Sequence, residues 1–156
     1  MLRTTLVFLR RGDEVLLAMK KRGFGAGQWN GPGGKIEPQE TPEAAARREV
    51  REEVGVELGD IKKVAQMEFY LSEDHKDYPT HVHCTIYVCK DWTGEPSESE
   101  EMAPRWFGVQ DVPYDEMWPD DRYWLPHVLA GAQVEGEFEL GRDNALLAWS
   151  IRSTKR

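Results

Sequence analysis

The chain has 156 residues, and its 20 Lys and Arg against 28 Asp and Glu give a formal net charge of −8. This length suits one domain with its own hydrophobic core, and 40% hydrophobic residues are too many for a disordered chain. The negative charge argues against a broad basic surface for long DNA or RNA and against a polybasic membrane anchor. No apolar run approaches the roughly 18 residues of a membrane span, so we expect no membrane partner. The acidic excess is compatible with binding of divalent cations.

The N-terminal third predicts a β-hairpin, a loop and a helix. Strands are expected over residues 2–9 and 15–19, joined by a turn. Residues 23–34 hold six glycines and one proline, which predicts a loop that approaches something closely or repeatedly takes positive φ. Thr41 suits an N-cap and Gly55 suits the position just past a helix, so a helix is predicted between them.

The rest of the chain predicts further strands and one more helix. A helix over residues 120–130 is expected to be disturbed by Pro126. No linker or repeat divides the chain, so we expect one domain over residues 1–156, an α+β or α/β sandwich with a mixed sheet. Strands are expected over residues 61–71, 81–90, 105–107, 134–140 and 145–151, with loops at 72–80 and 91–104.

Two cysteines, Cys84 and Cys89, lie in one predicted strand. Five residues apart, they point to opposite faces of the sheet, so a disulfide within the strand is implausible. Free thiols are typical of reducing compartments, and we therefore expect a cytoplasmic protein in which both thiols have packing roles.

Three glutamates gather on one side of the first predicted helix. At about 100° per residue, Glu49, Glu52 and Glu53 share an arc of roughly 100°. Like charges four residues apart, and negative charge near a helix C-terminus, are both unfavourable. Pairing of Arg48 with Glu52 relieves only part of this cost. The arrangement is either a solvated charged face or a site for a hard divalent cation. A bound cation would turn the repulsion among the three carboxylates into a net attraction.

The glycine-rich segment leads directly to this helix but fits neither standard phosphate-binding pattern. Trp29 stands where a P-loop has its first glycine, and Ile36 stands where it has Ser or Thr. A dinucleotide-binding fingerprint fails because position 28 is Gln. Alone, the segment is equally compatible with a flexible loop.

Loop and helix together match a longer motif. Residues 34–56 read Gly34-x5-Glu40-x7-Arg48-Glu49-Val50-x-Glu52-Glu53-x-Gly55-Val56 and agree with the Nudix box, G-x5-E-x7-R-E-U-x-E-E-x-G-U, at every fixed position. The chain therefore resembles the Nudix hydrolases. Residues 19–27, 29–31, 98–107 and 117–126 also resemble the MutT-like oxidised-purine nucleoside triphosphatases, a group that acts on 8-oxo-dGTP and 2-hydroxy-dATP.

The resemblance implies a Nudix α/β/α sandwich and hydrolysis of a small nucleoside triphosphate to a monophosphate and pyrophosphate. It implies Mg²⁺ as the cofactor, with Mn²⁺ able to substitute. By position, Glu49, Glu52, Glu53 and Glu101 bind metal or activate water, and which of them is the general base stays open. The Gly33 carbonyl corresponds to a metal ligand. Arg48 would orient Glu52 through a charge-assisted hydrogen bond.

The resemblance also implies a purine site. Asn30, Asp120 and Asp121 correspond to purine-contacting residues, and Trp118 and Phe24 to apolar contacts. Two adjacent carboxyls in an enclosed pocket do not both ionise easily, so one would be protonated and donate, which suits both 6-oxo and 6-amino purines. Without the resemblance, the aspartates fit an ordinary helix N-terminus. Further substrate contacts are expected from Lys20, Thr5 and Phe69.

Some positions depart from the mammalian-type pattern. Gln28 replaces a basic residue, and Pro32, Leu71 and His83 replace aromatic ones, so the preferred oxidised base stays open. His81 and His83 share a strand face, for which we expect packing or surface roles.

Two other functions also stay open: a Nudix hydrolase of a dinucleoside polyphosphate, nucleotide sugar or capped RNA end, and a non-catalytic nucleotide-binding module. We expect a monomer.

Overall fold

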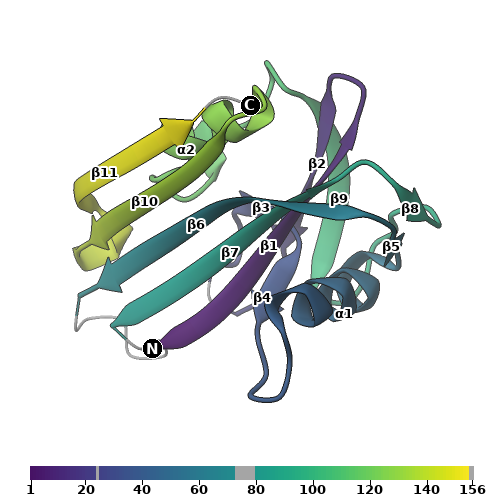
Figure 1. The fold of residues 1–156 in the computed structure, drawn as a ribbon, viewed down its shortest axis with the longest axis horizontal. Helices are drawn as coiled ribbons and strands as arrows, with labels where there is room; N and C mark the ends of the chain where they lie inside the picture. The colour runs from purple at the N-terminus through teal and green to yellow at the C-terminus, as the bar shows by residue number, and fades with distance from the viewer. Residues whose placement is uncertain (24, 73–79, 155–156) are drawn as a thin grey trace.

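A mixed β-sheet lies between two helices (Figure 1). The structure is a computed structural model that describes residues 1–23, 25–72 and 80–154. The helices are α1 (Pro42–Val54) and α2 (Asp121–Leu129), with short 3₁₀ turns at Tyr114–Glu116 and Arg142–Asn144. The strands are β1 (Leu2–Arg11), β2 (Glu14–Lys20), β3 (Trp29–Asn30), β4 (Gly33–Lys35), β5 (Glu57–Leu58), β6 (Ile61–Leu71), β7 (His81–Cys89), β8 (Trp92–Thr93), β9 (Met102–Gly108), β10 (Gln133–Leu140) and β11 (Leu146–Thr154).

β1 pairs with three other strands of the sheet, β2, β4 and β7. The strand order is β11-β10-β6-β7-β1-β2-β3, with β4 paired to β1 and β9 paired to β2. The β1–β7 and β6–β10 pairs are parallel, whereas β6–β7, β10–β11, β1–β2, β1–β4 and β2–β9 are antiparallel. The predicted mixed sheet is therefore confirmed. The parallel pairs bring together segments that are far apart in the sequence, which matters for the site below.

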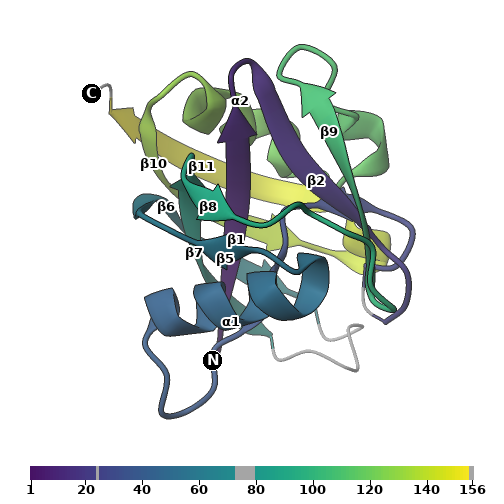
Figure 2. The same cartoon turned by 90° about the vertical axis from the view of Figure 1, so that its right-hand side faces the viewer.

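The two helices cover opposite faces of the sheet (Figure 2). On one face, Trp124, Leu125 and Val128 of α2 pack with apolar side chains of β1, β6, β7 and β10. On the other, Ala46 and Val50 of α1 pack with apolar side chains of β1, β2 and β7. Burial of these apolar surfaces is the main term that holds the three layers together. The predicted α/β/α sandwich is confirmed.

The first helix begins and ends as its sequence predicts. The Thr41 hydroxyl accepts a hydrogen bond from the Ala44 amide at 3.1 Å, and Pro42 occupies the first turn. Gly55 ends the helix in the left-handed conformation at φ 75°, which glycine adopts at little cost. Glu53 is buried on the same side as the helix's apolar residues. One carboxylate of the box is thereby fixed against the sheet.

Several boundaries differ from the sequence prediction. The glycine-rich segment contains the short strands β3 and β4, because their backbones find partners in β2 and β1. The region predicted as a loop over residues 91–104 contains β8 and the start of β9. α2 runs through Pro126 without interruption. Proline removes one hydrogen bond there, but the buried side chains of Trp124, Leu125 and Val128 hold the helix against the sheet.

Both cysteines are free and buried. Cys84 belongs to the core on the α2 side and Cys89 to the core on the α1 side, which confirms that they point to opposite faces. Burial raises the pKa of the Cys84 thiol to about 12, so it stays protonated at neutral pH. Within residues 1–23, 25–72 and 80–154, no helix is long and apolar enough to cross a membrane.

Candidate active site

Arg48 organises the carboxylates of α1. Its Nε and Nη2 atoms donate to the two carboxylate oxygens of Glu40 at 2.7 and 2.8 Å. Its Nη1 atom donates to Glu49 at 2.8 Å and to Glu52 at 3.2 Å, and Nη2 also donates to the Lys35 carbonyl at 3.1 Å. The bidentate pair lowers the pKa of Glu40 to about 2. Arg48 thus contacts Glu52 as predicted, but its strongest contacts are with Glu40, to which the sequence assigned no role.

Glu53 is a buried carboxyl with few compensating contacts. Its residue is 5% exposed, and its Oε1 atom accepts a hydrogen bond from the Gly33 amide at 2.9 Å. Burial, followed by the negative charges of Glu49 and Glu101, raises its pKa to about 8. Burial also raises the pKa of Glu49, although Arg48 opposes the shift. Without a cation, this pair therefore holds a proton at neutral pH.

Two consecutive glycines let β4 approach these carboxylates. A Cβ atom on Gly33 would lie 2.0 Å from the Thr5 carbonyl oxygen, and one on Gly34 would lie 2.6 Å from the Glu49 carboxyl carbon. Larger residues at either position would displace the backbone of β1 or the carboxylate of α1. The close approach predicted for the glycine-rich segment is thus found at these two glycines.

The carboxylates suit a divalent cation without forming a finished cage. Nowhere in the described chain do three Asp, Glu, His or Cys side chains converge closely enough to hold a metal ion. The Glu52 side chain is 59% exposed and turned to Arg48, and Glu101 is exposed. However, Mg²⁺ keeps several waters and is usually bound by one or two carboxylates plus substrate phosphates. The buried pair of Glu49 and Glu53 fits that requirement, since a cation would replace the proton that burial favours.

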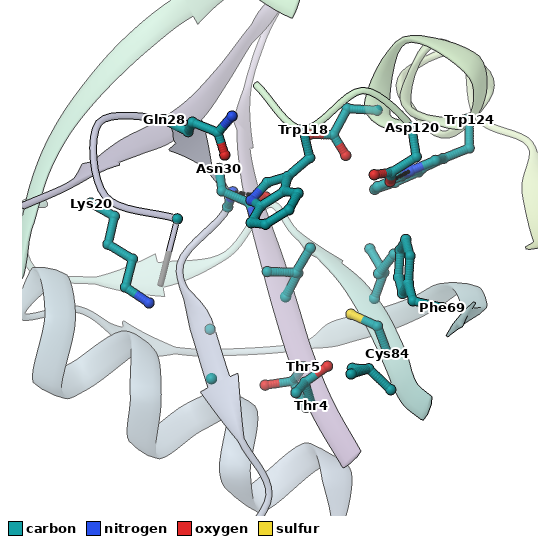
Figure 3. A pocket seen from close by; sticks show the side chains of 18 of the residues that line it. Thr4, Thr5, Lys20, Gln28, Asn30, Phe69, Cys84, Trp118, Asp120 and Trp124 are labelled. Atoms are coloured by element: carbon teal, nitrogen blue, oxygen red, sulfur yellow. Dashed lines mark hydrogen bonds between the residues drawn. The ribbon is translucent and has the colours of Figure 1, made fainter. Parts of the chain in front are cut away.

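A cavity of about 180 Å³ lies on the α2 side of the sheet and extends to the glycines of β4 (Figure 3). A cavity of about 150 Å³ holds benzene, so this one has room for a planar ring system. Phe69, Leu71, Val82, Ile86 and Leu140 supply apolar walls. The cavity is therefore suited to an aromatic ligand that carries a polar group toward α1.

Three side chains at the cavity present buried oxygens without a hydrogen-bond partner among the described residues. These are Thr5 Oγ1, Gln28 Oε1 and Asp121 Oδ2. A buried polar atom left unpaired costs about 1–3 kcal/mol, and such atoms in native structures call for an explanation. A ligand with donors on its edge supplies one. Asn30 lines the same cavity as Gln28 and Trp118 (Figure 3), and its own Oδ1 accepts from the Gly31 amide at 2.8 Å.

Asp120 and Asp121 are 2% and 3% exposed. Asp120 makes no capping hydrogen bond and instead accepts from Trp124 Nε1 at 2.8 Å, which argues against an ordinary helix N-terminus. Burial raises the pKa of both carboxyls, and the charge of Asp120 raises that of Asp121 further. Burial and the neighbouring charge thus favour the protonated form of Asp121, which can donate to a ligand, more than that of Asp120, which can accept.

Most predicted substrate contacts meet at this cavity, and some residues there were not predicted. Phe24 lies outside the described residues. Of the departures, Gln28 and Leu71 line the cavity, whereas Pro32 and His83 do not. Sequence reasoning missed Thr4, Cys84 and Trp124; the alternation of β7 and the four-residue spacing from Asp120 to Trp124 could have indicated the last two. The predicted residues at the cavity are Thr5, Lys20, Asn30, Phe69, Trp118, Asp120 and Asp121.

The two predicted surface histidines lie away from this cavity. His81 Nε2 and His83 Nδ1 contact the two carboxylate oxygens of Glu68 at 2.7 and 2.5 Å. The His81 ring also stacks on Tyr70 with a centroid separation of 4.7 Å. Glu68 and Tyr70 belong to the neighbouring strand β6, and neither histidine lines the cavity.

Comparison with known proteins shows which family the chain resembles. The model of the NUDIX domain matches residues 2–128, a span that includes α1, the glycine-rich segment and α2 up to Val128. The chain belongs to the Nudix family. Within this Nudix protein, the matched residues thus include the carboxylates on α1 and every lining residue of the cavity except Leu140.

Similar proteins with names cover nearly the whole chain. The chain is 40% identical over 148 residues to the mouse "Oxidized purine nucleoside triphosphate hydrolase", covering 95% of this chain and 92% of the mouse protein. A zebrafish protein of the same name is 42% identical over 135 residues, with 86% and 84% covered. The crystal structure of a MutT protein from Bacillus halodurans superposes with a TM-score of 0.85 at 25% identity and covers 97% of both chains.

Proposed function

We propose that this Nudix hydrolase cleaves oxidised purine nucleoside triphosphates, such as 8-oxo-dGTP and 2-hydroxy-dATP, to the monophosphate and pyrophosphate, and so sanitises the nucleotide pool. The observation that carries the proposal is the buried Asp120–Asp121 pair beside unpartnered Thr5 and Gln28 oxygens in a ring-sized cavity. The named relatives, at about 40% identity over most of the chain, support the same substrate class.

The α1 carboxylates would hold the divalent cation, which we propose is Mg²⁺ with Mn²⁺ able to substitute. Glu49 and Glu53 would be its first ligands, joined by Glu52, Glu101 and the Gly33 carbonyl. When bound, the cation neutralises phosphate charge and lowers the pKa of a water. Carboxylates are the residues here with the chemistry to take the proton from that water.

The other residues bind and orient the nucleotide. Lys20 lines the cavity and would hold phosphate oxygens. Trp118 and Phe69 would contact the faces of the base, and Asn30 with the two aspartates would read its edge. With the proton on Asp121 and none on Asp120, the pair would offer a donor and an acceptor together. That combination would favour an oxidised base whose edge has the matching acceptor and donor over a normal base whose edge lacks them.

We also propose that the protein acts as a monomer in a reducing, cytoplasmic compartment. Both cysteines are free and buried, as is typical of proteins from reducing compartments.

A substrate panel tests the function. Pyrophosphate release with Mg²⁺ would be measured from 8-oxo-dGTP, 2-hydroxy-dATP, O6-methyl-dGTP and the four normal nucleotides. A dinucleoside polyphosphate, a nucleotide sugar and a capped RNA end would be added. Highest kcat/KM on an oxidised purine supports the proposal, and highest kcat/KM on one of the added substrates would replace it. Loss of at least about 10²-fold in kcat for Glu53→Gln would exclude a contaminating activity and a non-catalytic role.

A further inference from the structure

Lys21 joins the strand that carries Lys20 to the turn that carries Glu101. β2 and β9 pair antiparallel, and the pairing continues past β2 because the Lys21 amide donates to the Glu101 carbonyl at 2.9 Å. The Lys21 Nζ atom donates to the Ser99 carbonyl at 2.8 Å and forms an ion pair with Glu98. One residue therefore contacts three of the four residues in the 98–101 turn.

This turn, residues 98–101, is a compact unit that Ser99 ties together. The Ser99 hydroxyl accepts from the amides of Glu101 and Met102 at 3.3 and 3.2 Å, and the Ser99 amide donates to the Met102 carbonyl at 2.9 Å. The backbone of Glu101 is thus held on both sides. Its side chain remains exposed, close enough to Glu53 for the two charges to interact.

We infer that Lys21 is a positioning residue that holds the 98–101 turn so that Glu101 can join Glu49 and Glu53 at the divalent cation. The inference rests on the proposed function, since it takes these glutamates as the cation site. Lys21 does not line the cavity, whereas its neighbour Lys20 does. An exposed glutamate loses conformational entropy when it binds, and a turn that is already fixed reduces that loss.

Lys21→Met is the direct test, because methionine keeps much of the aliphatic length and removes the ammonium group. Lys21→Arg restores the charge. Arg22→Met is the matched control: Arg22 lies next in the chain and contacts Glu100 of the same turn at 3.7 Å, but the two side chains are 65% and 89% exposed. Ion pairs between such exposed side chains contribute little free energy.

Mn²⁺ binding would be measured by electron paramagnetic resonance without nucleotide, beside the Mg²⁺ concentration that half-saturates turnover. We expect Lys21→Met to weaken Mn²⁺ binding about 10-fold, the lower end of losses for residues that orient metal ligands. Lys21→Arg should recover most of this loss, and Arg22→Met should stay within about 2-fold of the wild type. Glu101→Gln should weaken binding by a similar factor, and the double variant no further.

Unchanged Mn²⁺ binding in Lys21→Met, or losses that add fully in the double variant, would overturn the inference. A thermal melt checks that each variant is folded. If Lys21→Met does not fold, Ser99→Ala, which loosens the same turn, must show the same weakening or the inference is wrong. Because Mn²⁺ binding is measured without substrate, a preference for an unrelated nucleotide would refute the proposed function and leave this result standing.

Discussion

Glu53 is the residue of the site whose environment most favours a bound proton or cation. Its carboxyl is buried, and burial raises its pKa to about 8, from an ordinary value of 4.5. The folded protein therefore binds a proton that the unfolded chain releases between those values. A group of this kind contributes stability that is fully present below pH 4.5 and is lost as the pH rises toward 8.

In chelator, we accordingly expect the free energy of unfolding to fall between pH 5 and 8, with a limiting slope of about 1.4 kcal/mol per pH unit for one proton. Glu53→Gln keeps the shape without the charge, so its slope should be smaller. Urea denaturation of both proteins at pH 6 and 8 measures this. Equal slopes would show that Glu53 titrates normally. Saturating Mg²⁺ should flatten the wild-type slope, since a cation replaces the proton.

Under the proposed function, Asp120 would link base recognition to the α2 core, because its carboxylate accepts the hydrogen bond from Trp124. Asp120→Asn can keep the hydrogen bond from the indole, whereas Asp120→Ala leaves a buried N–H unpaired at a cost of about 1–3 kcal/mol. We expect both variants to lose discrimination between oxidised and normal purines by at least about 10-fold, with a smaller effect on kcat. Only the alanine variant should melt at a lower temperature. Steady-state kinetics on an oxidised and a normal purine nucleotide measures this discrimination. An equal loss of kcat/KM on every base would contradict the recognition role.

At the scale of elements, the contact between β4 and α1 separates catalysis from stability. The Cβ atom of Gly34→Ala would meet the Glu49 carboxylate, the mobile end of a side chain, at 2.6 Å. The carboxylate would move while the fold stays intact. We therefore expect kcat to fall by about 10-fold or more with little change in unfolding free energy.

Thr41→Ala is the opposite case on the same helix. It removes the N-cap bond at 3.1 Å and should cost about 1 kcal/mol of stability while leaving kcat near the wild-type value. Chemical denaturation and steady-state rates for the two variants check the contrast. If Gly34→Ala and Thr41→Ala each lowered both kcat and the free energy of unfolding to a similar extent, catalysis and stability would not be separable in α1.

The sequence predicted α1 better than it predicted the cavity, for a physical reason. Caps, box spacing and the glutamate arc are local, so Thr41, Glu49 and Gly55 could be placed from the chain alone. The walls of the cavity depend on parallel pairing of β1 with β7 and of β6 with β10, which joins residues far apart in sequence. Thr4 and Leu140 both line the cavity only because of that pairing, and no local pattern marks them.

Over the whole molecule, the buried carboxyls of α1 and of the start of α2 lie on opposite faces of one sheet. Carboxylates on the α1 side are poised for a cation, and the aspartates at the start of α2 are poised to share a proton with a base. The cavity between them extends from the aspartates to the glycines of β4. With a net charge of −8, we expect a polyanionic nucleotide to bind more readily when a divalent cation accompanies it, because the cation reduces the repulsion between like charges.

The ratio of kcat/KM for 8-oxo-dGTP to that for dGTP, followed by pyrophosphate release in Mg²⁺, tests the central claim most directly. Our account predicts a ratio of at least about 10, because Asp120 and Asp121 read an edge that oxidation changes. It also predicts that kcat/KM for 2-hydroxy-dATP exceeds that for dATP, since an aspartate pair that can both donate and accept would serve both purines. A ratio of one or less for both oxidised nucleotides would contradict it.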